Sequence, residues 1–251
     1  MTVRQLAGTT AVVTGASRGF GRAISVSLVE RGANVVGVAR NQELLAELKE
    51  QLGDAFTPQV ADVADPAVAM QLIAHYRPHT VVLNAGATPP VGSIREQTWE
   101  TFSINWNVDV RHVFNFTREV LTAPLEPGSV VVSLSSGAAL AGSPLSGGYA
   151  GAKGTIKLIS SYAAHEAQRL GADIRFVSVL PQLTPATGLG KIYTEQYAAM
   201  AGMSAAQFLE GRFGGTLSAE QVGESIADLA VDDSYTGLAY IVGTTGLQSV
   251  E

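Results

Sequence analysis

The chain has 251 residues, of which 46% are hydrophobic and 15% charged, and its formal net charge is −6. This composition is typical of a compact globular protein and excludes a disordered one. The acidic balance, with no run of Lys or Arg, argues against nucleic acid as the main partner. The absence of cysteine excludes disulfides, thiolate metal sites and a cysteine nucleophile.

No targeting or metal-binding signal is evident. The first residues lack the apolar stretch of a signal peptide, and no run of about 18 apolar residues predicts a membrane helix. The four histidines are scattered, without metal-ligand spacing: His75, His79, His112 and His165. We therefore expect a cytoplasmic protein that binds neither a membrane nor a metal ion.

Short apolar runs alternate along the chain with longer segments of helical period. Most of the runs are apolar throughout, as strands covered on both faces are. The predicted strands are Thr10–Thr14, Asn34–Ala39, Gln59–Ala61, Thr80–Leu83, Ser129–Ser133, Ile174–Leu180 and Leu238–Val242. The predicted helices are Gly21–Arg31, Gln42–Leu52, Pro66–His75, Thr98–Thr122, Gly148–Leu170 and Ala219–Ala230.

This alternation of strand and helix predicts a doubly wound parallel α/β sheet. No linker or internal repeat divides the chain, so we expect one domain over residues 1–251. Residues 185–215 depart from the alternation, because they are dotted with glycine and rich in aromatic and aliphatic side chains. They are predicted to form a small helical insertion that acts as a lid over a substrate.

The first predicted strand leads into the segment "TGASRGFG", Thr14 to Gly21. In a doubly wound sheet the first strand-to-helix turn binds phosphate through free backbone N–H groups and the helix dipole. Gly15 permits a tight turn, and Gly19 and Gly21 permit close approach of a pyrophosphate. Glycine turns of this kind are also common without a ligand, and the position before a predicted helix favours the binding interpretation.

The spacing of these glycines resembles the TGxxxGxG cofactor motif of the short-chain dehydrogenase/reductase family, and the resemblance extends over nearly the whole chain. It implies a Rossmann-type fold that binds a nicotinamide dinucleotide. Within the turn it assigns cofactor contacts to Gly15, Ser17, Arg18, Gly19, Phe20 and Gly21. After the third and fourth strands it assigns contacts to Asp62, Val63, Asn84, Ala85 and Gly86, although Asp62 and Asp65 are also candidates to cap the next helix.

The end of the second strand carries the signal for cofactor choice. A carboxylate there would accept hydrogen bonds from the ribose hydroxyls of NAD. The sequence instead has Ala39 followed by Arg40. Arg40 and Arg18 are suited to a 2′-phosphate, and a solvated surface position is the alternative for both. We therefore expect NADP(H) in preference to NAD(H).

The segment "YAGAK" places Tyr149 and Lys153 four residues apart, on one face of a predicted helix. A phenol ordinarily ionises near pH 10, and a nearby ammonium favours the phenolate, so such a pair is a tuned acid/base. The resemblance makes both residues catalytic and cofactor-binding. It makes Ser136, thirteen residues before Tyr149, the catalytic serine, with Ser135 as the alternative.

The family's fourth catalytic residue is an Asn in the preceding long helix. The segment "INWNVDV" offers Asn105 and Asn107, and the resemblance favours Asn107. After the sixth strand the family has Pro-Gly, whereas this chain has Pro181-Gln182. Pro181, Leu183 and Thr184 are expected to lie next to the nicotinamide carboxamide, with Thr187 as the alternative to Thr184.

The resemblance implies a carbonyl reductase that interconverts a ketone and a secondary alcohol. Only Lys191 and Arg212 are basic in the predicted lid, which favours a free, rather apolar small molecule over a carrier-bound substrate. A 3-oxoacyl-thioester reductase is the alternative, and a non-enzymatic dinucleotide sensor is less compatible with the retained Ser, Tyr and Lys. By resemblance we expect a homo-oligomer, a tetramer in particular, joined through the two long helices.

Overall fold

The computed structural model describes residues 5–250, and its strands form one eight-stranded sheet in the order β3-β2-β1-β4-β5-β6-β7-β8. All neighbouring strands are parallel except β7 and β8, which form an antiparallel hairpin. The strands are β1 (Thr10–Thr14), β2 (Asn34–Ala39), β3 (Phe56–Val60), β4 (Thr80–Leu83), β5 (Ser129–Leu134), β6 (Ile174–Pro181), β7 (Ala239–Gly243) and β8 (Gly246–Ser249).

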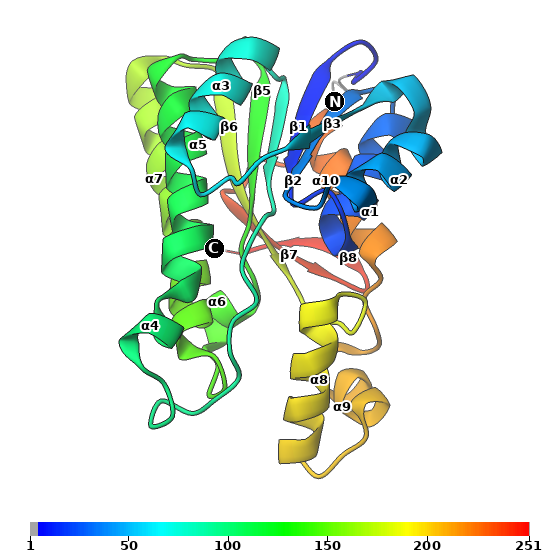
Figure 1. Cartoon of the computed structure of the whole chain (residues 1–251), viewed down its shortest axis with the longest axis vertical. Coiled ribbons are helices and arrows are strands. Elements are labelled where there is room, and N and C mark those ends of the chain that lie inside the picture. The colour runs from blue at the N-terminus through cyan, green and yellow to red at the C-terminus, as the bar shows by residue number, and fades with distance from the viewer. Residues whose placement is uncertain (1–4, 251) are drawn as a thin grey trace.

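Helices cover both faces of this sheet (Figure 1). One face carries α1 (Gly19–Glu30), α2 (Gln42–Leu52) and α10 (Ala219–Val231), and the other carries α3 (Pro66–Tyr76), α5 (Arg111–Thr122) and α7 (Gly147–Leu170). The remaining helical elements are η1 (Gly53–Ala55), α4 (Trp99–Phe102), η2 (Trp106–Val110), α6 (Ala138–Ala141), α8 (Gly188–Met200) and α9 (Ala205–Phe213). The doubly wound α/β architecture is thus confirmed.

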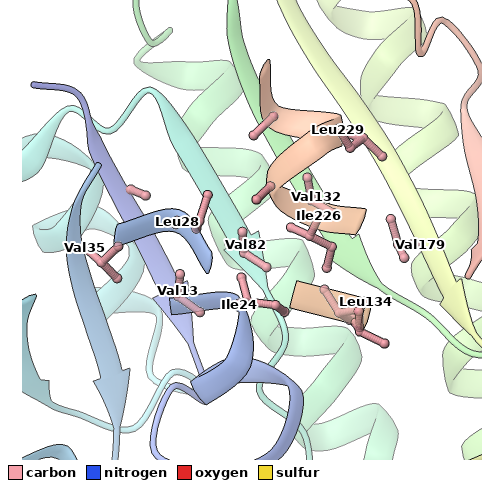
Figure 2. Packing of buried hydrophobic residues seen from close by; sticks show 14 of the residues in the cluster. Val13, Ile24, Leu28, Val35, Val82, Val132, Leu134, Val179, Ile226 and Leu229 are labelled. Atoms are coloured by element: carbon pink, nitrogen blue, oxygen red, sulfur yellow. The ribbon is translucent and has the colours of Figure 1, made fainter. Parts of the chain in front are cut away.

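The apolar runs read as strands because their side chains are buried on both sides. Val12 and Val81 join the core under α3, α5 and α7, whereas Val13 and Val82 join the core under α1 and α10. Figure 2 shows Ile24 and Leu28 of α1 and Ile226 and Leu229 of α10 over the strand valines. Each such side chain contributes about 1.5–3 kcal/mol when it leaves water.

The order of the strands determines where a ligand binds. The chain builds outward from β1 to β3 and then crosses back to β4, so the winding reverses between β1 and β4. The loops after these two strands therefore diverge at the carboxyl edge of the sheet, which is where ligands bind in open α/β sheets. The glycine turn after β1 and the segment after β4 both lie at this edge.

Three of the elements that differ from the sequence-based expectation have an evident physical reason. The third strand is Phe56–Val60 instead of Gln59–Ala61; it lies at the sheet edge, where Pro58 is tolerated. Strand β8 was not predicted, because it is a short and mostly polar edge strand. The helix predicted over Thr98–Thr122 is interrupted, because residues 106–110 form the wider π-helical turn η2.

Residues 185–215 contain the helices α8 and α9, which project beyond the sheet at its carboxyl edge (Figure 1). Within residues 5–250, none of the helices combines the length and apolar character needed to cross a bilayer. The same residues include no group of three or more His, Cys, Asp or Glu side chains arranged to hold a metal ion.

Candidate active site

The glycine turn after β1 has the geometry of a phosphate cradle. Gly15 and Gly19 have positive φ angles of 68° and 54°, and a Cβ on Gly21 would lie 2.1 Å from the Gly15 carbonyl oxygen. Helix α1 begins at Gly19 with no side-chain cap and no acidic residue in its first turn. The backbone N–H groups and the positive end of this helix are therefore suited to a pyrophosphate.

The segment after β4 is tied to this turn through Asn84 and Thr14. The Asn84 side-chain amide donates to the backbone oxygens of Thr14 (3.0 Å) and Gly15 (3.3 Å). The Thr14 hydroxyl accepts from the backbone N–H groups of Asn84 and Ala85. These bonds hold Ala85 and Gly86 beside the cradle, so the two segments form one surface.

The side chains expected near the adenosine lie at the ends of β2 and β3. Ala39 is buried, whereas Arg40 and Arg18 are exposed, and neither arginine is in an ion pair among the described residues. Val63 is buried, and the exposed Asp62 accepts from the Ala64 N–H. Asp65 caps α3 by accepting from the Ala67 N–H, so the helix-cap interpretation holds for Asp65.

Tyr149 and Lys153 lie in the first turns of α7, with the Lys153 ammonium 5.5 Å from the centre of the Tyr149 ring. The Tyr149 side chain is partly exposed, and Lys153 is only 6% exposed. The Lys153 Nζ donates to the Leu134 backbone oxygen at 3.0 Å, so the end of β5 fixes it in place. A half-exposed phenol beside a buried ammonium is the arrangement that an acid/base pair requires.

The two serines after β5 have different environments. Ser135 is buried, and its hydroxyl donates to the Lys153 backbone oxygen at 2.7 Å, which ties α7 to β5. Ser136 is partly exposed, and its hydroxyl accepts from the Ala138 N–H at 3.2 Å. Ser136 therefore keeps a hydroxyl proton available for a substrate oxygen, whereas Ser135 uses its proton within the fold.

The turn η2 brings Asp109, and not Asn107, to Lys153. Asn107 is exposed, and its amide donates to the Ser103 hydroxyl at 3.3 Å. Asp109 is 1% exposed, and its Oδ2 forms an ion pair with Lys153 Nζ at 3.2 Å. Asn107, which the resemblance favours as the fourth catalytic residue, is therefore not the residue that contacts Lys153; the π-helical turn includes both residues and presents Asp109 to the lysine. Asn105, the other asparagine of this segment, is 1% exposed and donates to the Asp109 carboxylate.

Asp109 raises the pKa of Lys153. Burial favours the neutral amine, but the Asp109 carboxylate and the Tyr149 phenol outweigh this effect, so the pKa of Lys153 lies above its usual value. The sequence interpretation missed Asp109. The available signal was its spacing of four residues from Asn105, since both side chains then lie on one face of a helix and reach the same loop.

The segment after β6 is held by several backbone contacts. The Pro181 oxygen accepts from the Gly137 N–H at 3.1 Å, and the Gln182 side chain packs against Gly243. The Thr184 hydroxyl is buried and donates to the Leu217 oxygen, whereas Leu183 is partly exposed. Thr187 caps α8 and contacts the glycine turn, since a Cβ on Gly19 would lie 3.4 Å from its methyl group.

A small pocket lies beside Tyr149, and α8 contacts its rim. The Tyr193 hydroxyl donates to the Pro89 and Pro90 oxygens, each at 3.3 Å. The Tyr197 hydroxyl pairs with Ser143, which also bonds to Ser146 at 2.7 Å. The pocket is lined by Pro89, Pro90, Gln97, Thr101, Phe102, Asn105 and residues 146–149.

Comparison with known proteins finds similarity to dehydrogenases and reductases. The family model for short chain dehydrogenases matches residues 9–198. Versicolorin reductase 1 of Aspergillus parasiticus is 34% identical over 160 residues, which are 61% of each chain. The 3-oxoacyl-[acyl-carrier-protein] reductase FabG of Salmonella typhimurium is 28% identical over 248 residues, 95% of this chain and 94% of that protein.

Solved structures share the fold. The crystal structure of NAD⁺-bound xylitol dehydrogenase has a TM-score of 0.84 at 19% identity and covers 96% of this chain and 99% of its own. The 3-ketoacyl-(acyl-carrier-protein) reductase of Brucella melitensis, complexed with NADH, has a TM-score of 0.79 at 23% identity, with 94% and 97% covered.

Proposed function

Since the chain belongs to the short-chain dehydrogenases, a family of NAD(P)-dependent oxidoreductases, we propose that it interconverts a ketone and a secondary alcohol with NADP(H). One observation carries this proposal. The partly exposed Tyr149 phenol and the buried Lys153 ammonium lie together, beside β5 at the edge of the sheet that also carries the glycine cradle.

In the proposed reduction, each residue has a separate role. Tyr149 donates its proton to the substrate oxygen, and the Ser136 hydroxyl donates a hydrogen bond that orients this oxygen. The Lys153 ammonium stabilises the negative charge that develops on the Tyr149 oxygen during proton transfer, and it binds the ribose next to the nicotinamide. The bound dinucleotide supplies the hydride. The cradle residues Gly15, Ser17, Gly19, Phe20 and Gly21 would hold its pyrophosphate.

The preference for NADP(H) rests on the end of β2. Ala39 offers no carboxylate to a ribose hydroxyl, and the exposed Arg40 and Arg18 are free to bind a 2′-phosphate in bidentate fashion. Asp62, Val63, Asn84, Ala85 and Gly86 are proposed to contact the adenosine, and Pro181 and Leu183 the nicotinamide. Thr184 is a weaker candidate than Thr187, because its hydroxyl is already bonded inside the fold.

For the substrate we propose a small, rather apolar carbonyl compound, with residues 185–215 as its lid. Prolines, Phe102 and glycines form much of the pocket beside Tyr149. A 3-oxoacyl thioester is the second candidate, supported by the similarity to FabG over almost the full chain. Its carrier protein is acidic, however, and Lys191 and Arg212 are the only basic residues of the proposed lid.

We further propose a cytoplasmic homo-oligomer, a tetramer in particular. The outward surfaces of α5 and α7 expose large apolar side chains, among them Phe114, Leu158 and Tyr162. A second copy of the chain would cover this surface.

The proposed reaction is tested with Tyr149→Phe. The variant should bind NADPH normally and lose about 10²- to 10⁴-fold in turnover of a ketone panel, because only the donated proton is removed. Tyr76→Phe is the matched control, since Tyr76 ends α3, outside the proposed site and the proposed interface. Normal turnover by Tyr149→Phe would refute the acid assignment.

The parent protein tests the cofactor and substrate classes directly. We expect a lower KM for NADPH than for NADH, and faster turnover of free ketones than of acyl thioesters. A parent that binds NADPH tightly but reduces no ketone, aldehyde or acyl thioester would instead be a dinucleotide sensor.

A further inference from the structure

The family resemblance assigns the fourth catalytic position to an amide side chain, but the side chain of this helix that pairs with Lys153 is the carboxylate of Asp109. We propose that Asp109 is a positioning residue that makes the Tyr149–Lys153 pair retain its proton to higher pH than a neutral side chain would. This inference deepens the proposed function and rests on it for the roles of Tyr149 and Lys153.

The contacts of Asp109 connect the lysine to the segment after β4. Oδ2 pairs with Lys153 Nζ at 3.2 Å, and Oδ1 accepts from the Ala87 N–H at 2.8 Å. The Asn105 amide donates both to Oδ1 (3.3 Å) and to the Ala87 oxygen (2.8 Å). A Cβ on Gly86 would lie 2.6 Å from Oδ2, so the carboxylate is packed directly against the proposed cofactor segment.

The burial of this pair makes its charges effective. Asp109 is 1% exposed and Lys153 6%, so water screens neither group well. Apart from this ion pair, Oδ2 has no hydrogen-bond partner among the described residues. Within residues 5–250, the other hydrogen bond of the Lys153 ammonium goes to an uncharged acceptor, the Leu134 backbone oxygen. Asp109 is thus the counter-charge of the buried lysine.

The other titratable groups that face the Asp109–Lys153 ion pair do not replace the negative charge of Asp109. On α7 the neighbouring titratable group of this ion pair is Tyr149, which is the acid of the proposed reaction. From α5 it faces His112, whose pKa burial and then the Lys153 charge lower to about 3, so the imidazole is neutral at working pH. The segment after β4 and the end of β5 contribute backbone groups and the uncharged Asn105 amide.

The direction of the effect follows from the total charge. With Asp109 ionised, the net charge of Asp109, the Lys153 ammonium and the neutral Tyr149 phenol is zero. Loss of one proton from Tyr149 or Lys153 then leaves a net negative charge in a buried site. With a neutral side chain, the same loss takes the site from +1 to zero. Removing the negative charge of Asp109 therefore lowers the pH at which the first proton leaves, whether that proton comes from Tyr149 or from Lys153.

The test is Asp109→Asn, compared with the parent by NMR of protein labelled in the tyrosine rings and lysine side chains. Tyr149→Phe and Lys153→Arg assign the signals. We expect the first proton release of the pair to move down by about one to three pH units. The alkaline limit of kcat/KM for ketone reduction should move down equally. Asp54→Asn, at an exposed carboxylate, is the matched control and should change neither.

Asp109→Ser is the second variant, because it also removes the charge and keeps an acceptor for the Ala87 N–H. Unshifted proton release in a folded Asn or Ser variant would overturn the proposal, as would an upward shift. The NMR titration needs no turnover. A parent inactive on every carbonyl compound, with a shifted titration, would therefore contradict the proposed function and leave the role of Asp109 intact.

Discussion

At the residue scale, His112 combines complete burial with a weak set of partners. It lies in α5, one helical turn after Asp109, and its ring packs edge-on against Phe116. Neither ring nitrogen makes a hydrogen bond of ordinary geometry among the described residues, although the Ala85 backbone lies close. Burial is the main reason, and the Lys153 charge the second, that its pKa falls from 6.5 to about 3.

This histidine makes folding sensitive to acid. The unfolded chain binds a proton at His112 below pH 6.5, whereas the folded chain stays neutral there down to about pH 3. The free energy of unfolding therefore falls as the pH falls below 6.5, by about 1.4 kcal/mol per pH unit from this group. Above pH 6.5 both states are neutral at His112 and the contribution is constant.

We expect His112→Leu to lose this part of the acid sensitivity. Between pH 7 and pH 5 the parent should lose about 2 kcal/mol more of its free energy of unfolding than the variant. Urea unfolding at the two pH values measures the difference. His165→Leu, on the outer part of α7, is the control and should follow the parent. Equal pH dependence of parent and His112→Leu would contradict the assignment of a neutral buried imidazole.

At the element scale, helix α8 is fastened to the segment after β4. Tyr193 is 5% exposed and donates to two proline oxygens that line the pocket beside Tyr149. Tyr197 lies one turn further along α8 than Tyr193, and its hydroxyl contacts the Ser143 hydroxyl. These bonds hold the middle of α8 against the substrate side of the site, whereas Thr187 at its start lies next to the glycine turn.

Tyr193→Phe should loosen this attachment without disturbing the cofactor segments. One lost hydrogen bond of this kind costs about 0.5–1.5 kcal/mol, so we expect the KM for a ketone to rise about 2- to 10-fold. The affinity for NADPH, measured by fluorescence titration, should stay the same. Tyr76→Phe, at the end of α3, is the control for the loss of a hydroxyl. A weakened NADPH affinity with unchanged ketone KM would show that α8 serves the cofactor instead.

Element boundaries also show what the sequence alone can and cannot predict. The strands β1, β2 and β4 match their predicted bounds, because valine-rich runs between turns have no other stable place than a buried sheet. The turn η2 was not predictable, because the contact that accompanies it joins Asn105 to Ala87, and a periodicity argument contains no such long-range contact. Because of this turn, Asp109 and not Asn107 lies beside Lys153.

At the scale of the whole molecule, the outward surface formed by α5 and α7 remains to be explained. Phe114, Leu158 and Tyr162 are 52%, 67% and 72% exposed. Both helices pack against the same face of the sheet, so their outward sides form a broad surface (Figure 1). A stable dimer buries roughly 800 Å² per partner, and two helices of 12 and 24 residues are long enough to supply that area.

Leu158→Glu tests whether this surface joins two copies of the chain. In the single chain Leu158 is mostly exposed, so the substitution should change the free energy of unfolding by no more than about 0.5 kcal/mol. In an interface core the same carboxylate would be buried without a partner, at a cost of several kcal/mol. Sedimentation velocity should therefore show an oligomeric parent and a variant of lower mass. Met70→Glu, at an exposed apolar residue of α3, is the control and should keep the parent's mass. A monomeric parent, or a Leu158→Glu protein with unchanged mass, would exclude this surface as the interface.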